Sequence, residues 1–335
     1  MLEISAQVSD YGDLLEFGRS IAGDGQHEDE EVLAGRVETP PLRSILYVPG
    51  NRREWIQKCH RFNADAIVLD LEDSVPIAER EQARKIISEE IGPLAARVRS
   101  VWVRVNAEAT SLVDDLAAAV RPGIKVIQLP KVFSAKSVVD LDHRLGYFEG
   151  RNGLAFHSTV ISPILETAGG IQRAYEIAMA SSRVEYLGAV VAPEGDTARA
   201  LRMTVMHDAI GTESLYVRGK VVVDARAAGV RHVIGGTVTD LSPKHELLRS
   251  FSSMNRAMGY SGTLLIHPDQ VPVAHELFGP SAENIKEALE VLRLLRASPG
   301  RAAVRNAATG KMIDLAHGRH AYWVLKEAHA FEKQK

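Results

Sequence analysis

The strongest constraint on the fold is a regular alternation of short apolar runs with longer helical patterns. Eight runs rich in β-branched or apolar residues begin about every 31 residues, which is the length of one strand–helix–strand unit. They occupy residues 44–48, 66–71, 101–105, 125–129, 158–165, 186–191, 232–238 and 263–267. This alternation predicts a parallel sheet covered by helices.

The intervening segments carry the apolar periodicity of helices, as at residues 77–91, 111–120 and 170–182. Eight such units can close into a barrel or form an open doubly wound sheet, and periodicity alone does not separate the two. Neither G-x-G-x-x-G nor G-x-x-x-x-G-K-[ST] follows an early strand, which disfavours the nucleotide-binding forms of the open sheet. We therefore expect an α/β fold of the (β/α)₈ TIM-barrel type.

Two flanking segments are expected outside this barrel. Residues 1–41 contain an acidic run and close with two prolines, so they are interpreted as an N-terminal extension outside the core. The barrel is assigned to residues 42–298, ending with a helix over 283–297. Residues 299–335 form a C-terminal appendage with a final helix, free to pack on a neighbouring subunit.

Composition excludes several classes of protein. The formal net charge is −3 and the sequence has no long basic run, so a nucleic-acid partner is not expected. No stretch reaches the roughly 18 apolar residues of a membrane span, and the acidic first residues do not resemble a secretory signal. The single cysteine, Cys59, excludes an intrachain disulfide and suits a reducing compartment, so we expect a cytoplasmic protein.

The ends of strands two and three carry opposite charges. Asp70 and Glu72 share one face of strand two and Asp73 begins the next loop, where buried carboxylates require cations, metal or backbone donors. The alternative for Asp73 is a cap on the following turn. Arg104 lies on the same face of strand three as Trp102 and needs an anionic partner. Arg104 can form a structural ion pair with strand two and contact a substrate at the same time.

Further carboxylates follow strands five and six. Glu166 stands where strand five gives way to a helix, and the glycines at 169 and 170 would let a ligand approach the backbone. Glu194 and Asp196 follow strand six. Glu166 with one of these acids is typical of a Mg²⁺ site completed by water and substrate oxygens. The alternative is that each acid caps the helix that it precedes.

The histidines do not indicate zinc. The sequence lacks H-E-x-x-H, and His157, His232 and His267 stand at strand edges, where a structural imidazole is the stronger interpretation.

Two arginines and one hydroxyl complete the candidates. Arg52 and Arg53 follow strand one, where they could bind an anionic phosphate or simply belong to a solvated first turn. Ser44 has no base at a motif spacing, and the same holds for the thiol described above, so nucleophilic catalysis is not indicated.

Several ordered motifs resemble one family, the citrate lyase beta subunit-like group of the hydroxy-dioic-acid aldolases. RSILYVPGNR resembles the family's R-S-x-L-[FY]-V-P-G, and ADAIVLDLEDSV resembles its A-D-x-[VI]-x-L-D-L-E-D-[AS]-V. VRVN resembles its strand-three arginine motif, LPKV its P-K-x and ILETAGG its E-T-A-x-G. Later in the chain, LLIHPDQV resembles I-H-P-x-Q and TGKMID resembles G-x-M-[IV]-D. The similarity covers roughly residues 43–330 in the right order.

The resemblance implies a TIM barrel that binds Mg²⁺, with Mn²⁺ as a possible substitute, and makes or breaks a carbon–carbon bond. Glu166 would be the first metal ligand. The family's second ligand lies in F-G-x-E-D, where this chain has VAPEGD, so Asp196 is the expected ligand and Glu194 the second choice. Arg104 would orient substrate, and Lys131 after strand four is expected to bind it, with a structural role equally open.

The remaining implied roles are acid–base and structural. Glu72 and Asp73 would surround the metal waters and the strand-three arginine. Asp314 resembles the aspartate that family members deliver into a neighbouring subunit's site, so a homotrimer or hexamer is expected.

The resulting functional hypothesis is a Mg²⁺-dependent carbon–carbon lyase acting on a hydroxyacyl thioester of coenzyme A or an acyl carrier, giving a 2-oxo acid and an acyl thioester. Two alternatives stay open. One is a metal-dependent aldolase acting on free 2-oxo acids such as pyruvate, and the other is a non-catalytic binding subunit with a degenerate metal site.

Overall fold

The computed structural model divides the chain into two compact units. The barrel unit is Gly35–Phe278, and the terminal unit combines Met1–Ala34 with Gly279–Lys335. The structure describes residues 8–22, 36, 39–189, 195–204, 211–239, 241–301 and 303–332.

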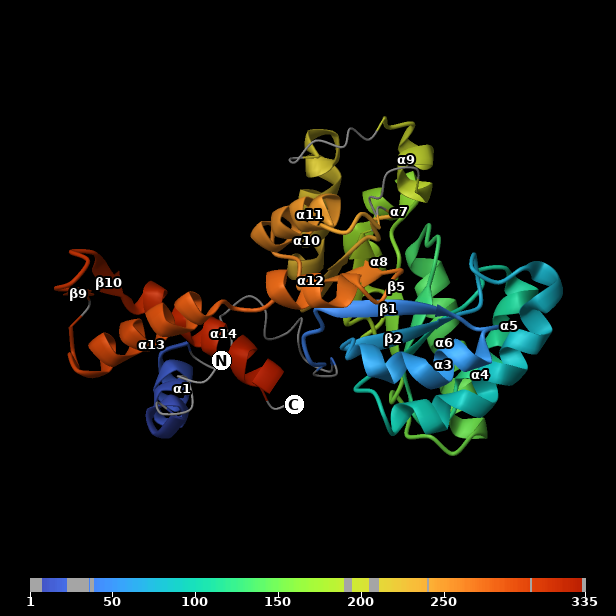
Figure 1. The fold of residues 1–335 in the computed structure, drawn as a ribbon, viewed down its shortest axis with the longest axis horizontal. Helices are drawn as coiled ribbons and strands as arrows, with labels where there is room; N and C mark the ends of the chain where they lie inside the picture. Colours follow the sequence, from blue (N-terminus) through green and yellow to red (C-terminus); the bar gives the residue numbers. More distant parts are fainter. Residues whose placement is uncertain are drawn as a thin grey trace. The chain divides into compact units, whose positions relative to one another are not determined.

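The described part of the barrel unit contains eight parallel strands (Figure 1). They are β1 Ser44–Pro49, β2 Ala66–Asp70, β3 Val101–Arg104, β4 Ile124–Leu129, β5 Val160–Pro163, β6 Tyr186–Ala189, β7 His232–Gly235 and β8 Gly262–Leu265. Their order is β5-β4-β3-β2-β1-β8-β7-β6. Parallel bridges from Ile161 to Val184 and from Ile164 to Gly188 join the two outer strands. The predicted (β/α)₈ barrel is confirmed, because the sheet closes on itself.

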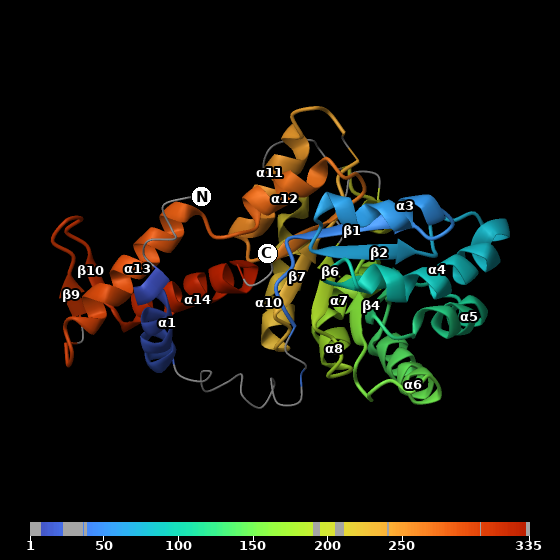
Figure 2. The same ribbon diagram turned by 60° about the horizontal axis from the view of Figure 1, so that its bottom comes forward.

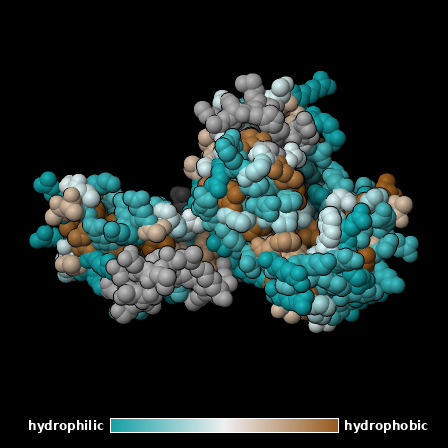
Figure 3. Space-filling model, in the orientation of Figure 1, coloured by the Kyte–Doolittle hydropathy of each residue, from teal (hydrophilic) through white to brown (hydrophobic). Residues whose placement is uncertain are grey.

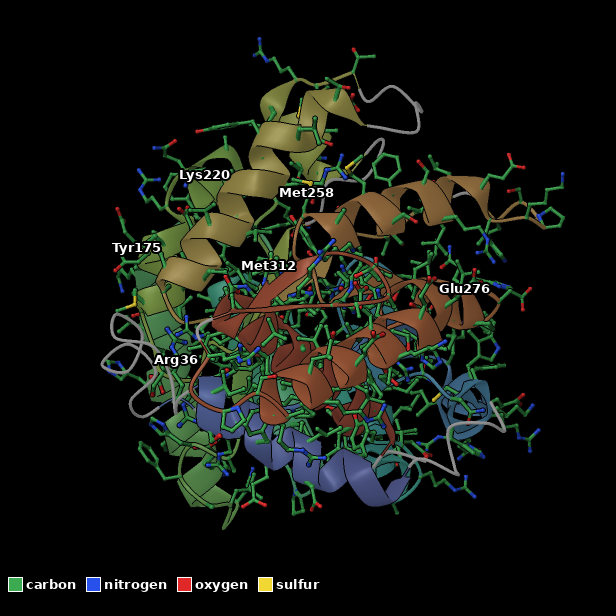
Figure 4. All side chains as sticks on the ribbon, turned by 90° about the vertical axis from the view of Figure 1, so that its left-hand side faces the viewer. Arg36, Tyr175, Lys220, Met258, Glu276 and Met312 are labelled. Atoms are coloured by element: carbon green, nitrogen blue, oxygen red, sulfur yellow. The ribbon has the colours of Figure 1, made fainter. Side chains whose placement is uncertain are left out.

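Helices surround these strands, as Figures 1 and 2 show. They are α3 Arg53–Lys58, η2 Cys59–Phe62, η3 Ile77–Glu79, α4 Arg80–Ala95, α5 Ala109–Ala119, α6 Ala135–Arg151, α7 Ala168–Gln172, α8 Ala174–Met179, α9 Asp196–Leu201, η4 Thr212–Ser214, α10 Leu215–Ala227, α11 Glu246–Ala257 and α12 Gln270–Leu277. The single helix expected over 170–182 is broken at Arg173, which separates α7 from α8. Figure 4 places Tyr175 of α8 and Lys220 of α10 on neighbouring helices.

The strands bury apolar residues on both of their faces. The inner face fills the barrel with a layer that includes Val68, Trp102, Val126 and Tyr186. The outer face packs against the helices in a second, larger core. Because side chains alternate along a strand, residues two apart from this inner layer also point inward. Figure 3 shows the helices presenting mostly hydrophilic residues on the visible face, with hydrophobic residues in the seams.

The amino-terminal ends of the strands are closed by the residues before β1. The Tyr186 hydroxyl donates to the carbonyl of Pro40 at 2.9 Å, and His232 Nε2 lies 3.0 Å from the carbonyl of Thr39. The Arg36 guanidinium donates to backbone carbonyls, among them that of Ala228 at 2.7 Å. These residues were expected outside the core, but they belong to the barrel unit.

The terminal unit is built from helices at the two ends of the chain. It contains α1 Val8–Ala22, α13 Ala282–Arg296 and α14 Leu315–Glu332, with an antiparallel hairpin of β9 Ala303–Arg305 and β10 Met312–Asp314. Figure 4 looks onto this unit, with Met312 marking β10.

A small core holds these helices together. Leu14 of α1 is buried with Leu292 of α13 and Leu325 of α14, and the hydroxyl of Tyr11 donates to the carbonyl of Leu325 at 2.7 Å. The helix assigned to the end of the 42–298 domain therefore packs in the terminal unit, with a helix from the expected 1–41 extension. Among the described residues, no helix has the length and apolar character to cross a membrane.

Candidate active site

Polar side chains form a row across the barrel interior at the carboxyl ends of neighbouring strands. Asp70 pairs in register with Arg104, Arg104 with Gln128, and Gln128 with Ser162. All four lie two residues beyond the inner apolar layer, so strand alternation turns them inward as well. The row places charge at the end of a TIM barrel where active sites form.

Arg104 is held by two carboxylates and one aromatic ring. Its Nε and Nη2 each lie 2.7 Å from one oxygen of Asp70, and Nη1 lies 3.1 Å from Glu72 Oε2. Its guanidinium carbon lies 4.6 Å from the ring centroid of Tyr47, whose hydroxyl donates to Gln128 at 2.5 Å. Sequence analysis missed Tyr47 and Gln128, although inward alternation of their strands could have indicated both. The predicted ion pair with strand two is confirmed.

Asp70 organises the turn after β2. Its Oδ1 accepts from the amide of Glu72 at 3.0 Å, and its Oδ2 accepts from the Ser74 hydroxyl at 2.5 Å. Burial acts to raise the pKa of Asp70, but hydrogen bonds from Arg104 and Ser74 hold that pKa below its ordinary value. The turn is therefore capped by Asp70, and Asp73 extends into solvent instead.

Lys131 contacts four acids from three segments of the chain, which are the turn after β2, the end of β5 and the start of α9. Its backbone adopts a left-handed conformation with φ of 54°, and its amide donates to Glu166 Oε1 at 2.8 Å. Its Nζ lies 2.5 Å from Glu72, 3.3 Å from Asp73 and 3.6 Å from Asp196. These carboxylates raise the pKa of Lys131 despite the opposing effect of partial burial, so it remains a cation at the centre of the acid cluster.

Glu166 is a buried carboxyl with one direct backbone donor. Burial, aided by the nearby charges of Glu72 and Asp196, raises its pKa to about 7, against the lowering effects of the Lys131 amide and Arg104. The helix cap that Glu166 could have supplied is made by Thr167, whose hydroxyl accepts from the amide of Gly170. Its carboxylate is therefore available for a ligand.

Asp196 is the first residue of α9. The N-cap position belongs to Gly195, which leaves the Asp196 carboxylate free of the predicted capping role. Its Oδ1 accepts from Arg199 at 2.5 Å and its Oδ2 faces Lys131. The alternative ligand, Glu194, lies outside the described residues.

The acid cluster fits a magnesium ion held by two carboxylates. The charge of Asp196 acts to raise the pKa of Glu166, as one anion does when another lies close to it. Glu72 Oε2 is buried without a directed hydrogen bond. Among the described residues no three His, Cys, Asp or Glu side chains converge on one point, so water and substrate oxygens would complete the coordination, as is usual for Mg²⁺.

The loop after β4 fills the space beside the two glycines of α7. A Cβ atom on Gly169 would lie 2.2 Å from Phe133 Cε2, and one on Gly170 would lie 2.1 Å from the carbonyl oxygen of Val132. These contacts explain why positions 169 and 170 are glycine, and the approach of a ligand to their backbone stays a prediction. The two glycines are required for close contact between the ends of β4 and β5, which brings Lys131 to Glu166.

Two other predicted residues stand outside this cluster. Asp314 lies in the terminal unit at the start of α14, where its side chain contacts His317. Arg53 forms ion pairs with Glu89 and Glu90, which favours a structural role over anion binding.

The structure does place a base beside Ser44, which sequence spacing did not indicate. Ser44 Oγ lies 2.8 Å from His275 Nε2, and the same nitrogen lies 3.5 Å from Asp65 Oδ1. Ser44 is fully buried at the amino-terminal end of β1, and both contacts use one ring nitrogen. A catalytic triad needs its base oriented through the other nitrogen, so this group is structural.

The predicted structural histidines keep that interpretation. His232 stacks on Tyr186 inside the barrel, His157 lies in a left-handed turn with its amide bonded to Glu149, and His267 Nδ1 accepts from the amide of Asp269.

Comparison with known proteins gives consistent matches. The family model described as HpcH/HpaI aldolase/citrate lyase matches residues 43–268. Citrate lyase subunit beta of Haemophilus influenzae is 31% identical over 288 residues, covering 85% of this chain and 96% of that protein. The human mitochondrial citramalyl-CoA lyase is 30% identical over 285 residues, covering 82% of each chain.

A solved structure extends this likeness. The CitE protein of Mycobacterium tuberculosis, in complex with magnesium, acetoacetate and coenzyme A, is 27% identical with a TM-score of 0.67. The match covers 88% of this chain and 100% of the CitE chain.

Proposed function

We propose, from the premise that this chain belongs to the HpcH/HpaI aldolase/citrate lyase family, that it is a Mg²⁺-dependent carbon–carbon lyase acting on hydroxyacyl thioesters. The observation that carries the proposal is the cluster at the carboxyl ends of the strands, where Glu166 and Asp196 face the cations Lys131 and Arg104. Such a site can bind a metal ion and an anionic substrate together.

The substrate class follows from the charges and from the named relatives. Citramalyl-CoA lyase and citrate lyase subunit beta are among those relatives, and the solved CitE complex contains coenzyme A. We infer a hydroxyacyl thioester that yields an acyl thioester and a 2-oxo acid such as glyoxylate, pyruvate or oxaloacetate. The carrier is coenzyme A or an acyl carrier protein.

Glu166 and Asp196 would hold the metal ion. When bound, the ion supplies Lewis acidity and a template for the carboxylate and adjacent oxygen of the 2-oxo acid portion. For this role both carboxylates must be ionised, and Asp196 must exchange its contacts with Lys131 and Arg199 for the ion. Lys131 would then be released toward the substrate carboxylate, which supports its predicted binding role.

Arg104 would stabilise the negative charge that develops when the carbon–carbon bond breaks. Cleavage next to the thioester carbonyl leaves an enolate, and a fixed guanidinium in a site shielded from bulk water can stabilise it. Its two bonds to Asp70 fix the plane of the guanidinium, and Glu72 and Tyr47 restrict it from the other sides. The side chain is 15% exposed, so it can still be approached from the site.

Asp314 would supply the acid–base group. We propose that a neighbouring subunit delivers it into the site, as the motif TGKMID implies. In cleavage its Oδ2 would accept the proton of the substrate hydroxyl as that oxygen becomes the carbonyl of the 2-oxo acid, and would then give the proton to the enolate carbon; bond formation would move the proton in the opposite direction. This role requires a homo-oligomer, for which we propose a trimer or hexamer. The single buried thiol of Cys59 suits a reducing compartment, and we propose the cytoplasm.

A thioester panel tests the proposal. Purified protein with Mg²⁺ or Mn²⁺ is incubated with malyl, citramalyl and citryl thioesters, and release of 2-oxo acid is measured by coupled reduction. We expect release from at least one substrate, loss of release in Glu166→Ala, and full release in Glu54→Ala, which removes an exposed glutamate of α3. Product from free 2-oxo acids and aldehydes alone would replace the proposal with the aldolase alternative, and no turnover of any substrate would overturn it.

A further inference from the structure

All contacts of the Asp314 side chain are concentrated on one of its two oxygens. Oδ1 accepts from the amide of Ala316 at 3.0 Å and from the amide of His317 at 3.2 Å, and it lies 2.6 Å from His317 Nδ1. Within the described residues, Oδ2 has no hydrogen-bond partner. One oxygen is therefore anchored and the other is presented to its surroundings.

The anchor is built into the first turn of α14. Asp314 directly precedes this 18-residue helix and His317 is its third residue, so the imidazole reaches back over the helix start. The two amides are among those that a helix leaves without internal partners, and they favour negative charge. The 2.6 Å separation is that of a charge-assisted bond in which Nδ1 donates to the carboxylate.

His317 also lines a pocket of about 430 Å³ between α13 and α14. The charged or titratable side chains around it are few. Glu287 and His320 line the same pocket, and Glu287 forms an ion pair with Lys311 at 3.6 Å. Among the described residues, only His317 is within ion-pair distance of Asp314. The electrostatic environment of Asp314 is therefore set mainly by His317.

We propose that His317 is a positioning residue for catalysis, which fixes Oδ1 of Asp314 and thereby directs Oδ2, in the ionised form, toward the substrate of a neighbouring subunit. The inference rests on the proposed function, because it assumes that Asp314 exchanges a proton with substrate. The side-chain hydrogen bond from His317, followed by its backbone bond, lowers the pKa of Asp314. The carboxylate therefore stays ready to accept a proton at lower pH than an isolated aspartate would.

The competing interpretation is purely structural. Asp314 Oδ1 caps the start of α14 by accepting from the amides of Ala316 and His317, and His317 Nδ1 accepts from the Asp314 amide at 3.3 Å only when that nitrogen carries no proton. A cap alone would stabilise α14 and have no effect on proton transfer. The two interpretations differ in what they predict for the pH dependence of the reaction and for the carboxylate itself.

Three variants of the full chain separate them. His317→Ala removes the anchor, His317→Asn restores a neutral donor near the position of Nδ1, and His320→Ala is the matched control on the same helix and pocket. We expect His317→Ala to lower kcat about tenfold, the effect of one charge-assisted hydrogen bond, with KM within about twofold. The acid limb of the kcat/KM profile should move to higher pH. His317→Asn should recover most of kcat, and His320→Ala should match the parent.

Thermal unfolding of the same variants shows whether α14 has been weakened. His317→Ala with parental kcat and an unmoved acid limb would reduce the pair to a helix cap, whatever its effect on unfolding.

A second measurement separates failure of this inference from failure of the proposed function. The Asp314 carboxyl carbon is followed by NMR against pH in metal-free protein carrying ¹³C-labelled aspartate, with Asp314→Asn for assignment. We expect a higher pKa of Asp314 in His317→Ala than in the parent. An unchanged pKa would overturn the inference even if the enzyme is active. A raised pKa in a protein that turns over no thioester would contradict the proposed function alone.

Discussion

Glu166 provides the sharpest stability prediction, because its burial makes ionisation unfavourable in the folded protein. Its pKa of about 7, against an ordinary value of 4.5, means that ionisation at pH 8 costs the folded state about 3 kcal/mol, at about 1.4 kcal/mol per pH unit. The sign follows from the raised pKa. The contribution of Glu166 to stability is greatest below pH 4.5, where this carboxyl is protonated in both states, and that contribution declines as pH rises to about 7.

Glu166→Gln should remove this loss of stability. Glutamine keeps the shape and the oxygen that accepts from the Lys131 amide, but it carries no charge. In urea unfolding with EDTA, we expect the variant to exceed the parent by about 2 to 3 kcal/mol at pH 8, and to match it at pH 4.5. Glu54→Gln on exposed α3 is the control and should change neither value. Added Mg²⁺ should stabilise the parent and the Glu54→Gln control, but not Glu166→Gln.

Equal stability of Glu166→Gln and parent at pH 8 would refute this reasoning, since it would mean that Glu166 ionises without cost. A variant less stable than the parent at pH 8 would show that the ionised form is stabilised by its neighbours.

The remaining predictions concern the guanidinium of Arg104, the carboxylate of Asp65 before β2, and the contact between Gly169 and the loop after β4. Arg104→Lys cannot make two parallel bonds to one carboxylate, so kcat/KM should fall about 10²-fold or more in the thioester assay while metal affinity stays near the parental value. Asp65→Asn weakens the two hydrogen bonds that the Arg43 guanidinium donates to the Asp65 carboxylate, and should lower the free energy of unfolding by about 3 kcal/mol at pH 7. Despite burial, Arg43 holds the pKa of Asp65 below its ordinary value, so the difference between variant and parent should shrink as pH falls below about 4. Gly169→Ala should cost about 1 to 3 kcal/mol by urea unfolding, and adding Phe133→Ala should recover most of it; a double variant no better than Gly169→Ala would contradict the steric explanation.

Strand positions and the inward direction of the site residues could be predicted because both follow from local pattern. The spacing of apolar runs located each strand, and a period of two placed Arg104 on the face of Trp102. The polar ends of strands two and five then identified Glu72 and Glu166 without any structure.

Other features depend on contacts between distant segments. Lys131 has a left-handed backbone, and the loop that contains it packs against Gly169 and Gly170, a contact that no single run of sequence shows. No helix was predicted within residues 1–41, and local sequence does not show that α13 and α14 cover the apolar side of α1.

The most direct test of the account is Mn²⁺ titration followed by electron paramagnetic resonance, since the central claim is that Glu166 and Asp196 hold one divalent ion. We predict one site per chain in the parent, displaced by Mg²⁺, with affinity reduced at least tenfold in both Glu166→Ala and Asp196→Ala and retained in Glu54→Ala. Parental affinity in folded Glu166→Ala and Asp196→Ala would contradict the account.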